Sequence, residues 1–280
     1  MSFKIGFSTE TENTEKDNIE NAPIQTEAPV AKKSVVDVFF PDRHLTCSYY
    51  NDMFNLKRGD IVYVDGKLEG LRGRVVEINY NFKIKLSDYK RVIGIADTNV
   101  KGEFHLAGSH FITTDENALK YEKIISWFKA PEPEDEEFVS STDDESFELN
   151  DLSVMKISSS AAERGHEYYI ENKVQYIELN NGIGRAIVTG TKTYEIEFFY
   201  FDDLISHLTC NCYCAGACKH EFAGACKHEF ATMLQLRDIL DIIKNEYPTI
   251  DSNDYIAAVN KSTFFEFVID GNPKGSFTIG

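Results

Sequence analysis

The alternation of apolar and polar residues divides the chain into a strand-rich first half and a second half that contains a long amphipathic helix. Short apolar, β-branched runs with glycines between them predict strands at 34–40, 61–64, 74–78, 82–86 and 91–95. Several short strands with close turns favour a small barrel or a curled sheet. The capping-box pattern Thr113-x-x-Glu116, followed by apolar residues and Ala130-Pro131, predicts a helix after the barrel.

The second half reads as a β-meander followed by a helix. Hairpin turns at Asn180-Asn181-Gly182 and Thr189-Gly190-Thr191 join three predicted strands, at 174–179, 185–189 and 194–200. Apolar residues then recur at spacings of three and four from Phe230 to Tyr247, and Pro248 ends this predicted helix. We expect a short helix near 252–259 and a hairpin of 264–269 with 277–279 to complete the chain.

The negative charge lies largely outside these regions. The formal net charge is -17, and residues 131–151 contain ten acidic residues and no basic one. Residues 1–32 are also polar and acidic, so we expect both stretches to be disordered. The sequence therefore predicts an α+β protein with a leader at 1–32, a small β-barrel domain with a C-terminal helix at 33–130, an acidic linker at 131–157 and a second domain at 158–280.

Two further features concern the cellular location. The chain has no run of about 18 apolar residues, and its N-terminus lacks a basic region followed by an apolar one. We therefore expect no membrane span and a cytoplasmic, reducing location. In such a compartment clustered cysteines more often bind metal than form disulfides.

Five of the six cysteines lie between positions 210 and 226. The octad Ala215–Phe222 contains Cys-Lys-His and is repeated at once as Ala223–Phe230. Thiolate and imidazole ligands in this density are what a tetrahedral zinc site needs. The sequence thus predicts bound Zn²⁺ with a structural role, against the alternative of reduced thiols without metal.

Residues 163–235 resemble a SWIM zinc finger, whose pattern is Cys-x-Cys, a variable gap and Cys-x-His. The similarity extends to Arg164-Gly165 with Tyr168-Tyr169, Val174, Ala186-x-Val188-x-Gly190-Thr191-x-x-Tyr194-x-Ile196, and Phe230-Ala231 at a helix start. The resemblance implies a zinc ion that holds a β-meander to a helix. It also implies binding to DNA or to protein partners.

The duplicated octad offers two Cys-x-His pairs where the SWIM pattern needs one. We favour the second pair, because it runs directly into the long helix, whereas Gly224 would interrupt a helix that began at the first pair. The favoured ligands are Cys210, Cys212, Cys226 and His228. The alternative pair is Cys218 and His220, and Cys214 is a spare thiol or a substitute for Cys210.

Residues 56–78 resemble a KOW-type β-hairpin, in which Gly-Asp-x-Val-x-Val precedes a glycine-rich turn. This resemblance implies a small barrel of the kind found on RNA, ribosomes or transcription complexes. From Lys57 to Arg91 the net charge is +4, unlike the rest of the chain. The candidate nucleic-acid contacts are Lys57, Arg58, Lys67, Arg72, Arg74, Lys83 and Lys85, with Tyr63 and Tyr80 for stacking. The alternative is a purely structural barrel with solvated lysines.

The sequence contains no phosphate-binding loop, no Gly-x-Ser-x-Gly and no His-Glu-x-x-His. A catalytic zinc keeps one position open, whereas four good protein ligands are available here. We therefore predict a non-enzymatic, zinc-binding SWIM-type protein that binds nucleic acid, protein or both. The alternative is a pure protein–protein adaptor with no nucleic-acid contact, which the strongly acidic total charge favours.

Overall fold

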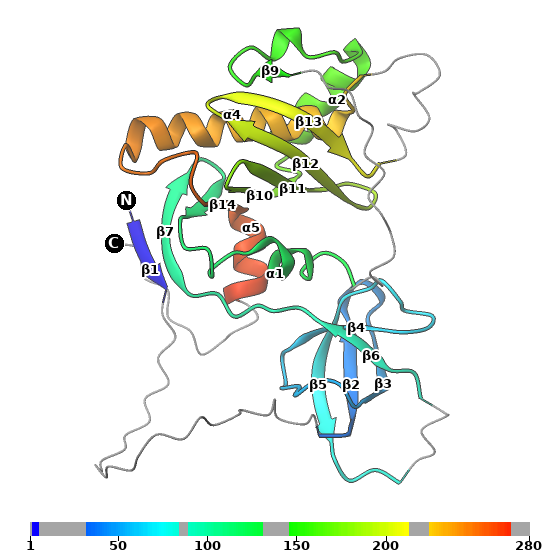
Figure 1. Cartoon of the computed structure of the whole chain (residues 1–280). Helices are drawn as coiled ribbons and strands as arrows, with labels where there is room; N and C mark the ends of the chain where they lie inside the picture. The colour runs from blue at the N-terminus through cyan, green and yellow to red at the C-terminus, as the bar shows by residue number, and fades with distance from the viewer. Residues whose placement is uncertain (1, 6–31, 84–88, 131–145, 213–223, 270–280) are drawn as a thin grey trace, which may run out of the picture. The chain divides into compact units, whose positions relative to one another are not determined.

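The computed structural model describes residues 2–5, 32–83, 89–130, 146–212 and 224–269. These residues form an α+β protein with two antiparallel sheets. The chain divides into two compact units (Figure 1): unit 1 comprises Met1–Ile5 and Ala96–Gly280, and unit 2 comprises Gly6–Ile95.

Unit 2 is a curled sheet of five strands among its described residues. The strand order is β3 (Leu45–Asn51), β2 (Ser34–Phe40), β5 (Gly73–Asn79), β4 (Ile61–Val64) and β6 (Val92–Ile95). The edge strands β3 and β6 approach each other at a bridge between Tyr50 and Arg91, so the sheet nearly closes on itself. Alternate side chains such as Val36, Val38 and Val62 fill its core.

Unit 1 contains a sheet of nine strands among its described residues. Its order is β1 (Ser2–Ile5), β7 (Gly102–Ala107), β8 (His110–Thr113), β14 (Ile256–Asn260), β10 (Val174–Asn180), β11 (Ile183–Thr189), β12 (Thr193–Phe201), β13 (Leu204–Cys210) and β9 (Phe147–Glu148). The predicted meander corresponds to β10–β12, and β13 continues it as a fourth antiparallel strand.

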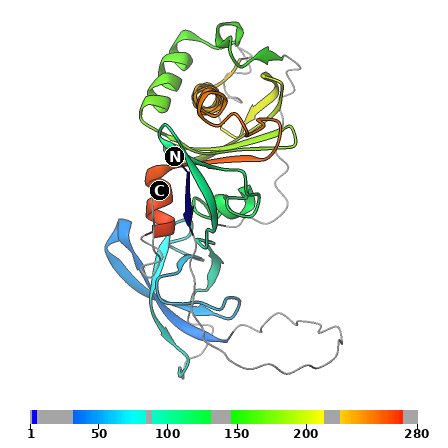
Figure 2. The same cartoon turned by 90° about the vertical axis from the view of Figure 1, so that its left-hand side faces the viewer.

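Helices pack on both faces of this sheet (Figures 1 and 2). The long helix α4 (Lys227–Glu246) lies on one face, and α2 (Ser159–Ile170) packs against α4. The core between α4 and the sheet includes Val188, Ile196, Phe198, Met233 and Leu236. The short helices α1 (Tyr121–Ile125) and α5 (Lys261–Phe264), with the π-helical turn η5 (Phe265–Ile269), lie on the opposite face.

The boundary between the two units differs from the predicted one. Residues 96–130 were expected in the barrel domain, but β8 pairs with β14 and Trp127 stacks on Phe267, which places them in unit 1. The helix expected after Thr113 is also reduced to α1. Thr113 is the last residue of β8, and its Oγ1 accepts a hydrogen bond from the Asp115 N–H.

Both segments expected to be disordered contribute strands to unit 1. Ser2–Ile5 form β1 beside β7, within the predicted leader. At the C-terminal end of the predicted linker, β9 pairs with β13, and a 3₁₀ helix (η3, Leu152–Val154) follows. Leu149, Leu152 and Met155 are buried in the main core, so this end of the predicted linker belongs to the folded part of unit 1.

The C-terminal extension also differs. Residues 256–260 form an internal strand, β14, where a short helix was expected, because they pair with β8 on one edge and β10 on the other and all five residues are buried. Residues 261–269 are helical, and they include residues 264–269, where a hairpin strand was expected. The predicted partner strand at 277–279 lies outside the described residues.

Candidate metal centre

The four favoured ligands meet where β13 ends and α4 begins. Cys210 is the last residue of β13 and pairs with Ile196 of β12, and Cys212 follows it in a buried position. Cys226 is the N-cap residue of α4, and His228 lies in the first turn of that helix. His228 is fully buried, and Cys212 and Cys226 are each only 6% exposed.

The spacing of the four ligand atoms fits a tetrahedral metal ion. Zinc bonds of about 2.3 Å to sulfur and about 2.0–2.1 Å to nitrogen place sulfur ligands about 3.8 Å apart and sulfur about 3.6 Å from nitrogen. His228 Nδ1 lies 3.7 Å from both Cys210 Sγ and Cys226 Sγ, and all four ligand atoms lie within 4.8 Å of one another. The three cysteines and the histidine can therefore bind one metal ion.

The electrostatics of the cluster also favour a cation. The side-chain hydrogen bond with Cys212, together with burial, raises the pKa of the Cys210 thiol. Hydrogen bonds with Cys210 and Cys212 likewise raise the pKa of the Cys226 thiol. Three neighbouring thiolates need positive charge between them, and a divalent ion supplies it. The N-terminus of α4 adds a favourable dipole at Cys226.

Two tyrosines fix the imidazole of His228. The ring of Tyr194, from β12, stacks on it with a centroid distance of 3.8 Å and an interplanar angle of 19°. Tyr168, from α2, meets it edge to face at 5.3 Å. These contacts orient Nδ1 toward the cysteines, while Nε2 is buried without a hydrogen-bond partner among the described atoms.

Two glycines allow these elements to approach so closely. A Cβ on Gly165 would lie 2.9 Å from the carbonyl oxygen of Lys227, so α2 contacts the first turn of α4 directly. A Cβ on Gly190 would lie 2.7 Å from Tyr168 Oη and 3.2 Å from Tyr194 Cε2. Several residues on which the SWIM resemblance was drawn thus surround the ligand cluster.

Three polar residues that support the ligands were not identified from the sequence. Asn211, between Cys210 and Cys212, exchanges backbone and side-chain hydrogen bonds with Glu195 of β12. The Glu229 carboxylate accepts a hydrogen bond from the Cys226 N–H, and burial raises its pKa to about 7. The spacing Cys226-x-x-Glu229 is that of a capping box, so Glu229 could have been found by that signal.

The remaining predicted metal ligands, Cys214, Cys218 and His220, lie outside the described residues. Which of the two Cys-x-His copies binds metal therefore stays a prediction. What the structure does show is that the second copy, with the Cys-x-Cys pair, forms one compact cluster.

The basic residues predicted in unit 2 are not equally accessible. Lys57, Arg58, Lys67 and Lys83 are exposed, as is Tyr80. Arg72 and Arg74 are half-buried, and Arg74 donates a hydrogen bond to the Gly59 carbonyl. Tyr63 is fully buried, so it is not available for stacking as predicted. Lys85 lies outside the described residues.

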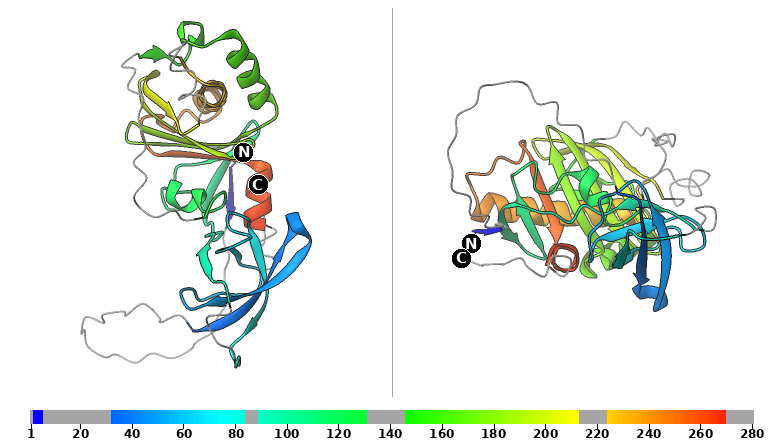
Figure 3. Two further views of the ribbon diagram at one scale, coloured as in Figure 1. Left: turned by 90° about the vertical axis from the view of Figure 1, so that its right-hand side faces the viewer. Right: turned by 90° about the horizontal axis from the view of Figure 1, so that it is seen from below.

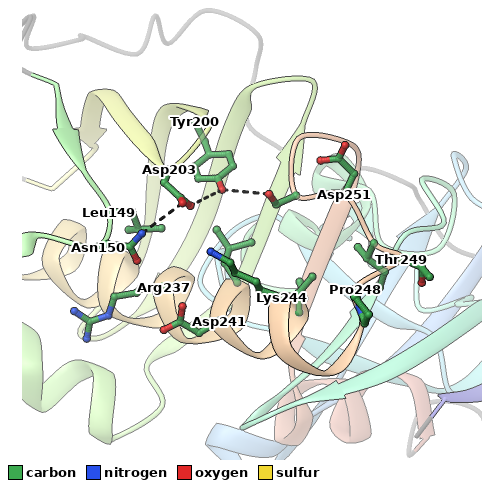
Figure 4. A pocket seen from close by; sticks show the side chains of 14 residues that line it. Leu149, Asn150, Tyr200, Asp203, Arg237, Asp241, Lys244, Pro248, Thr249 and Asp251 are labelled. Atoms are coloured by element: carbon green, nitrogen blue, oxygen red, sulfur yellow. Dashed lines mark hydrogen bonds between the residues drawn. The ribbon is translucent and has the colours of Figure 1, made fainter.

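A separate pocket of about 520 Å³ opens beside the C-terminal half of α4 (Figure 4). Leu240 and Ile243 contribute apolar surface, and Lys244 lies across it. The Tyr200 hydroxyl donates to Asp203 at 3.1 Å and lies 3.4 Å from Ser252 Oγ. These polar groups therefore join the β12–β13 turn to the loop after α4.

Comparisons with known proteins add no relative. No family model matches the chain, and searches of curated proteins and of solved structures find no match either. Within the described part of the chain, every helix is too short or too polar to cross a membrane.

Proposed function

We propose that this chain is a non-enzymatic, SWIM-type binding protein in which a structural Zn²⁺ holds α4 to the β-meander. The observation that carries the proposal is the set of three sulfur atoms and one nitrogen at tetrahedral spacing, of which all but the half-buried Cys210 are buried. Sulfur-rich sets with one imidazole are typical of zinc. Four protein ligands leave no position for substrate or water, which favours a structural role.

The position of the cluster explains what the ion would stabilise. Cys210 ends β13 and Cys212 follows two residues later, whereas Cys226 and His228 belong to the start of α4. The ion would join two ligand pairs, and thirteen residues of sequence separate Cys212 from Cys226. Its binding free energy, roughly 10–16 kcal/mol in zinc peptides, would be transferred to folding of unit 1.

Metal analysis of the purified protein tests this proposal. We expect one zinc per chain by mass spectrometry, and X-ray absorption with three sulfur and one nitrogen neighbours. Cobalt(II) substitution should give the visible spectrum of a tetrahedral thiolate site. Absence of bound metal, or a shell that contains a water oxygen, would overturn the structural zinc site.

For the partner, we propose nucleic acid bound by the exposed basic residues of unit 2. Lys57, Arg58 and Lys67 are exposed in a region of positive local charge, and Tyr80 offers an aromatic surface that is 53% exposed. Cationic side chains contact phosphates, and an exposed aromatic ring stacks on bases. The alternative is a pure protein–protein adaptor.

Oligonucleotide titration separates these two functions. Single-stranded and duplex oligonucleotides should bind with an affinity that falls as salt rises. In Lys57→Ala/Arg58→Ala the slope of the logarithm of the binding constant against the logarithm of salt concentration should decrease by about one for each lost phosphate contact. The control is Lys101→Ala/Lys120→Ala, which removes two exposed lysines of unit 1. Absence of salt-sensitive binding to either oligonucleotide would leave only the adaptor.

A further inference from the structure

An apolar patch lies on the outer face of the β12–β13 hairpin, on the opposite face of the sheet from α4. Ile183, Phe199, Phe201 and Leu204 form it, with exposed fractions of 43%, 49%, 67% and 44%. We refer to these four residues as the β12 patch. Antiparallel pairing places them together, since Ile183 is opposite Phe199 and Leu204 is opposite Phe201.

Strand alternation shows that the exposure of these residues is not needed for the fold. Phe198, which precedes Phe199, and Tyr200, which lies between Phe199 and Phe201, point into the core under α4. Phe199 and Phe201 point away from it, where a polar residue would serve a half-exposed strand equally well. Four side chains that each expose about half of roughly 200 Å² give a patch of roughly 400 Å², in the range of functional surface patches.

Two carboxylates border the patch. Glu148 of β9 is paired with Leu204 and is exposed. Glu197 precedes Phe199 on the same face of β12, and it shares the guanidinium of Arg185 with Glu122. Two carboxylates thus share one guanidinium, which leaves a net negative charge at this border of the patch.

We propose that the β12 patch is a docking surface for a protein segment that combines aromatic or aliphatic side chains with lysine or arginine. Apolar side chains would cover Phe199 and Phe201, and the basic ones would contact Glu148 and Glu197. A nucleic acid would be repelled by this charge. A second copy of the chain would place like-charged borders against each other.

The proposal is independent of the metal and of nucleic-acid binding by unit 2. It is tested with a phage-displayed library of random peptides, selected on the immobilised full-length, zinc-loaded protein and counter-selected on Phe199→Ser/Phe201→Ser. Enriched peptides should be basic and rich in aromatic or aliphatic residues. Their affinity should fall about tenfold or more in the double variant and should also fall as salt rises.

The matched control is Ile170→Ser, because Ile170 is a similarly exposed apolar residue (58%) on α2. It should leave peptide binding unchanged, and circular dichroism should show that all variants are folded. Failure to enrich any peptide, enrichment of acidic or uncharged peptides, or equal loss in the control would overturn the proposal. Self-association that the double variant abolishes would overturn it in favour of a second copy.

Discussion

Replacing Cys226 by serine removes one metal ligand and leaves the start of α4 intact. Serine is a preferred N-cap residue, and it retains the backbone N–H that donates to Glu229. The change replaces only sulfur by oxygen at a buried position. Its effect on metal binding is therefore separated from an effect on the helix itself.

The expected loss follows from the four-ligand geometry. If the roughly 10–16 kcal/mol of a zinc–peptide site is shared about equally by four ligands, each one accounts for about 2.5–4 kcal/mol. This corresponds to a decrease in zinc affinity of about 100- to 1,000-fold. Because the ion joins β13 to α4, the thermal transition of unit 1 should also move to lower temperature.

Competition with a chromophoric chelator measures the affinity, and differential scanning calorimetry measures the transition. Cys218→Ser, in the first octad, should retain zinc affinity within about threefold, since the second copy supplies the ligands. Cys47→Ser in β3 of unit 2 controls for loss of a thiol elsewhere. If Cys226→Ser retained zinc while Cys218→Ser lost it, the assignment of the second Cys-x-His copy would be refuted.

Three further perturbations are expected to have measurable effects. Tyr194→Leu removes the ring stacked on His228 and should lower zinc affinity about tenfold, measured by chelator competition. Deletion of residues 215–222 removes one of two identical octads and should leave one zinc per chain, measured by mass spectrometry. Burial lowers the pKa of His110 to about 4 from 6.5, so its contribution to stability is complete above pH 6.5 and is lost as the pH falls toward 4. Between pH 7 and pH 5 this histidine should lower the free energy of unfolding by about 2 kcal/mol. His110→Gln should abolish that part of the decrease, measured by urea denaturation at both pH values.

Each of these predictions has its own control. Tyr194→Phe keeps the stacked ring and should retain zinc affinity; an equal loss would show that the hydroxyl, which contacts Thr191, matters instead. A fall from two zinc ions to one on octad deletion would show that both copies bind metal. The exposed His166 provides the matched variant His166→Gln, and equal pH profiles for the two histidine variants would contradict the role of burial.

Short-range patterns predicted two kinds of element. The strands β2, β5 and β12 and the helix α4 occur close to their predicted positions, because alternation and three-to-four spacing record which face meets a core. The strands β4, β10 and β11 are mostly buried, and they occur close to their predicted positions because short β-branched runs are bounded by turn residues. The turns at Asn181 and Gly182 also occur as predicted, and both have positive φ.

Long-range pairing determined what the sequence pattern missed. Residues 256–260 are buried on both faces, and such a strand has no alternation that distinguishes it from a helix. Residues 96–130 follow the barrel strands directly in sequence, yet their partners are β14 and the C-terminal Phe267. No local pattern reports a partner that lies more than 100 residues away.

The ligands were identifiable because cysteine and histidine are rare and their spacing is informative, whereas the residues that hold them were not. Tyr194 reads as one aromatic residue among many in a strand, and its stack on His228 depends on how α4 packs. Asn211 and Glu195 are sixteen residues apart and meet only through the β12–β13 pairing. Supporting contacts of this kind become visible only when the fold is known.

The duplicated octad affects the loop more than it affects the ligand cluster. Lengthening the gap between Cys212 and the next cysteine from five to thirteen residues costs about 0.8 kcal/mol in loop-closure entropy. That is small beside the roughly 10–16 kcal/mol of a zinc site. The ligands that meet are fixed by β13 and by the first turn of α4, which Gly165 brings against α2. An insertion between them can therefore be tolerated, provided that the Cys-x-His copy adjoining the helix supplies the ligands.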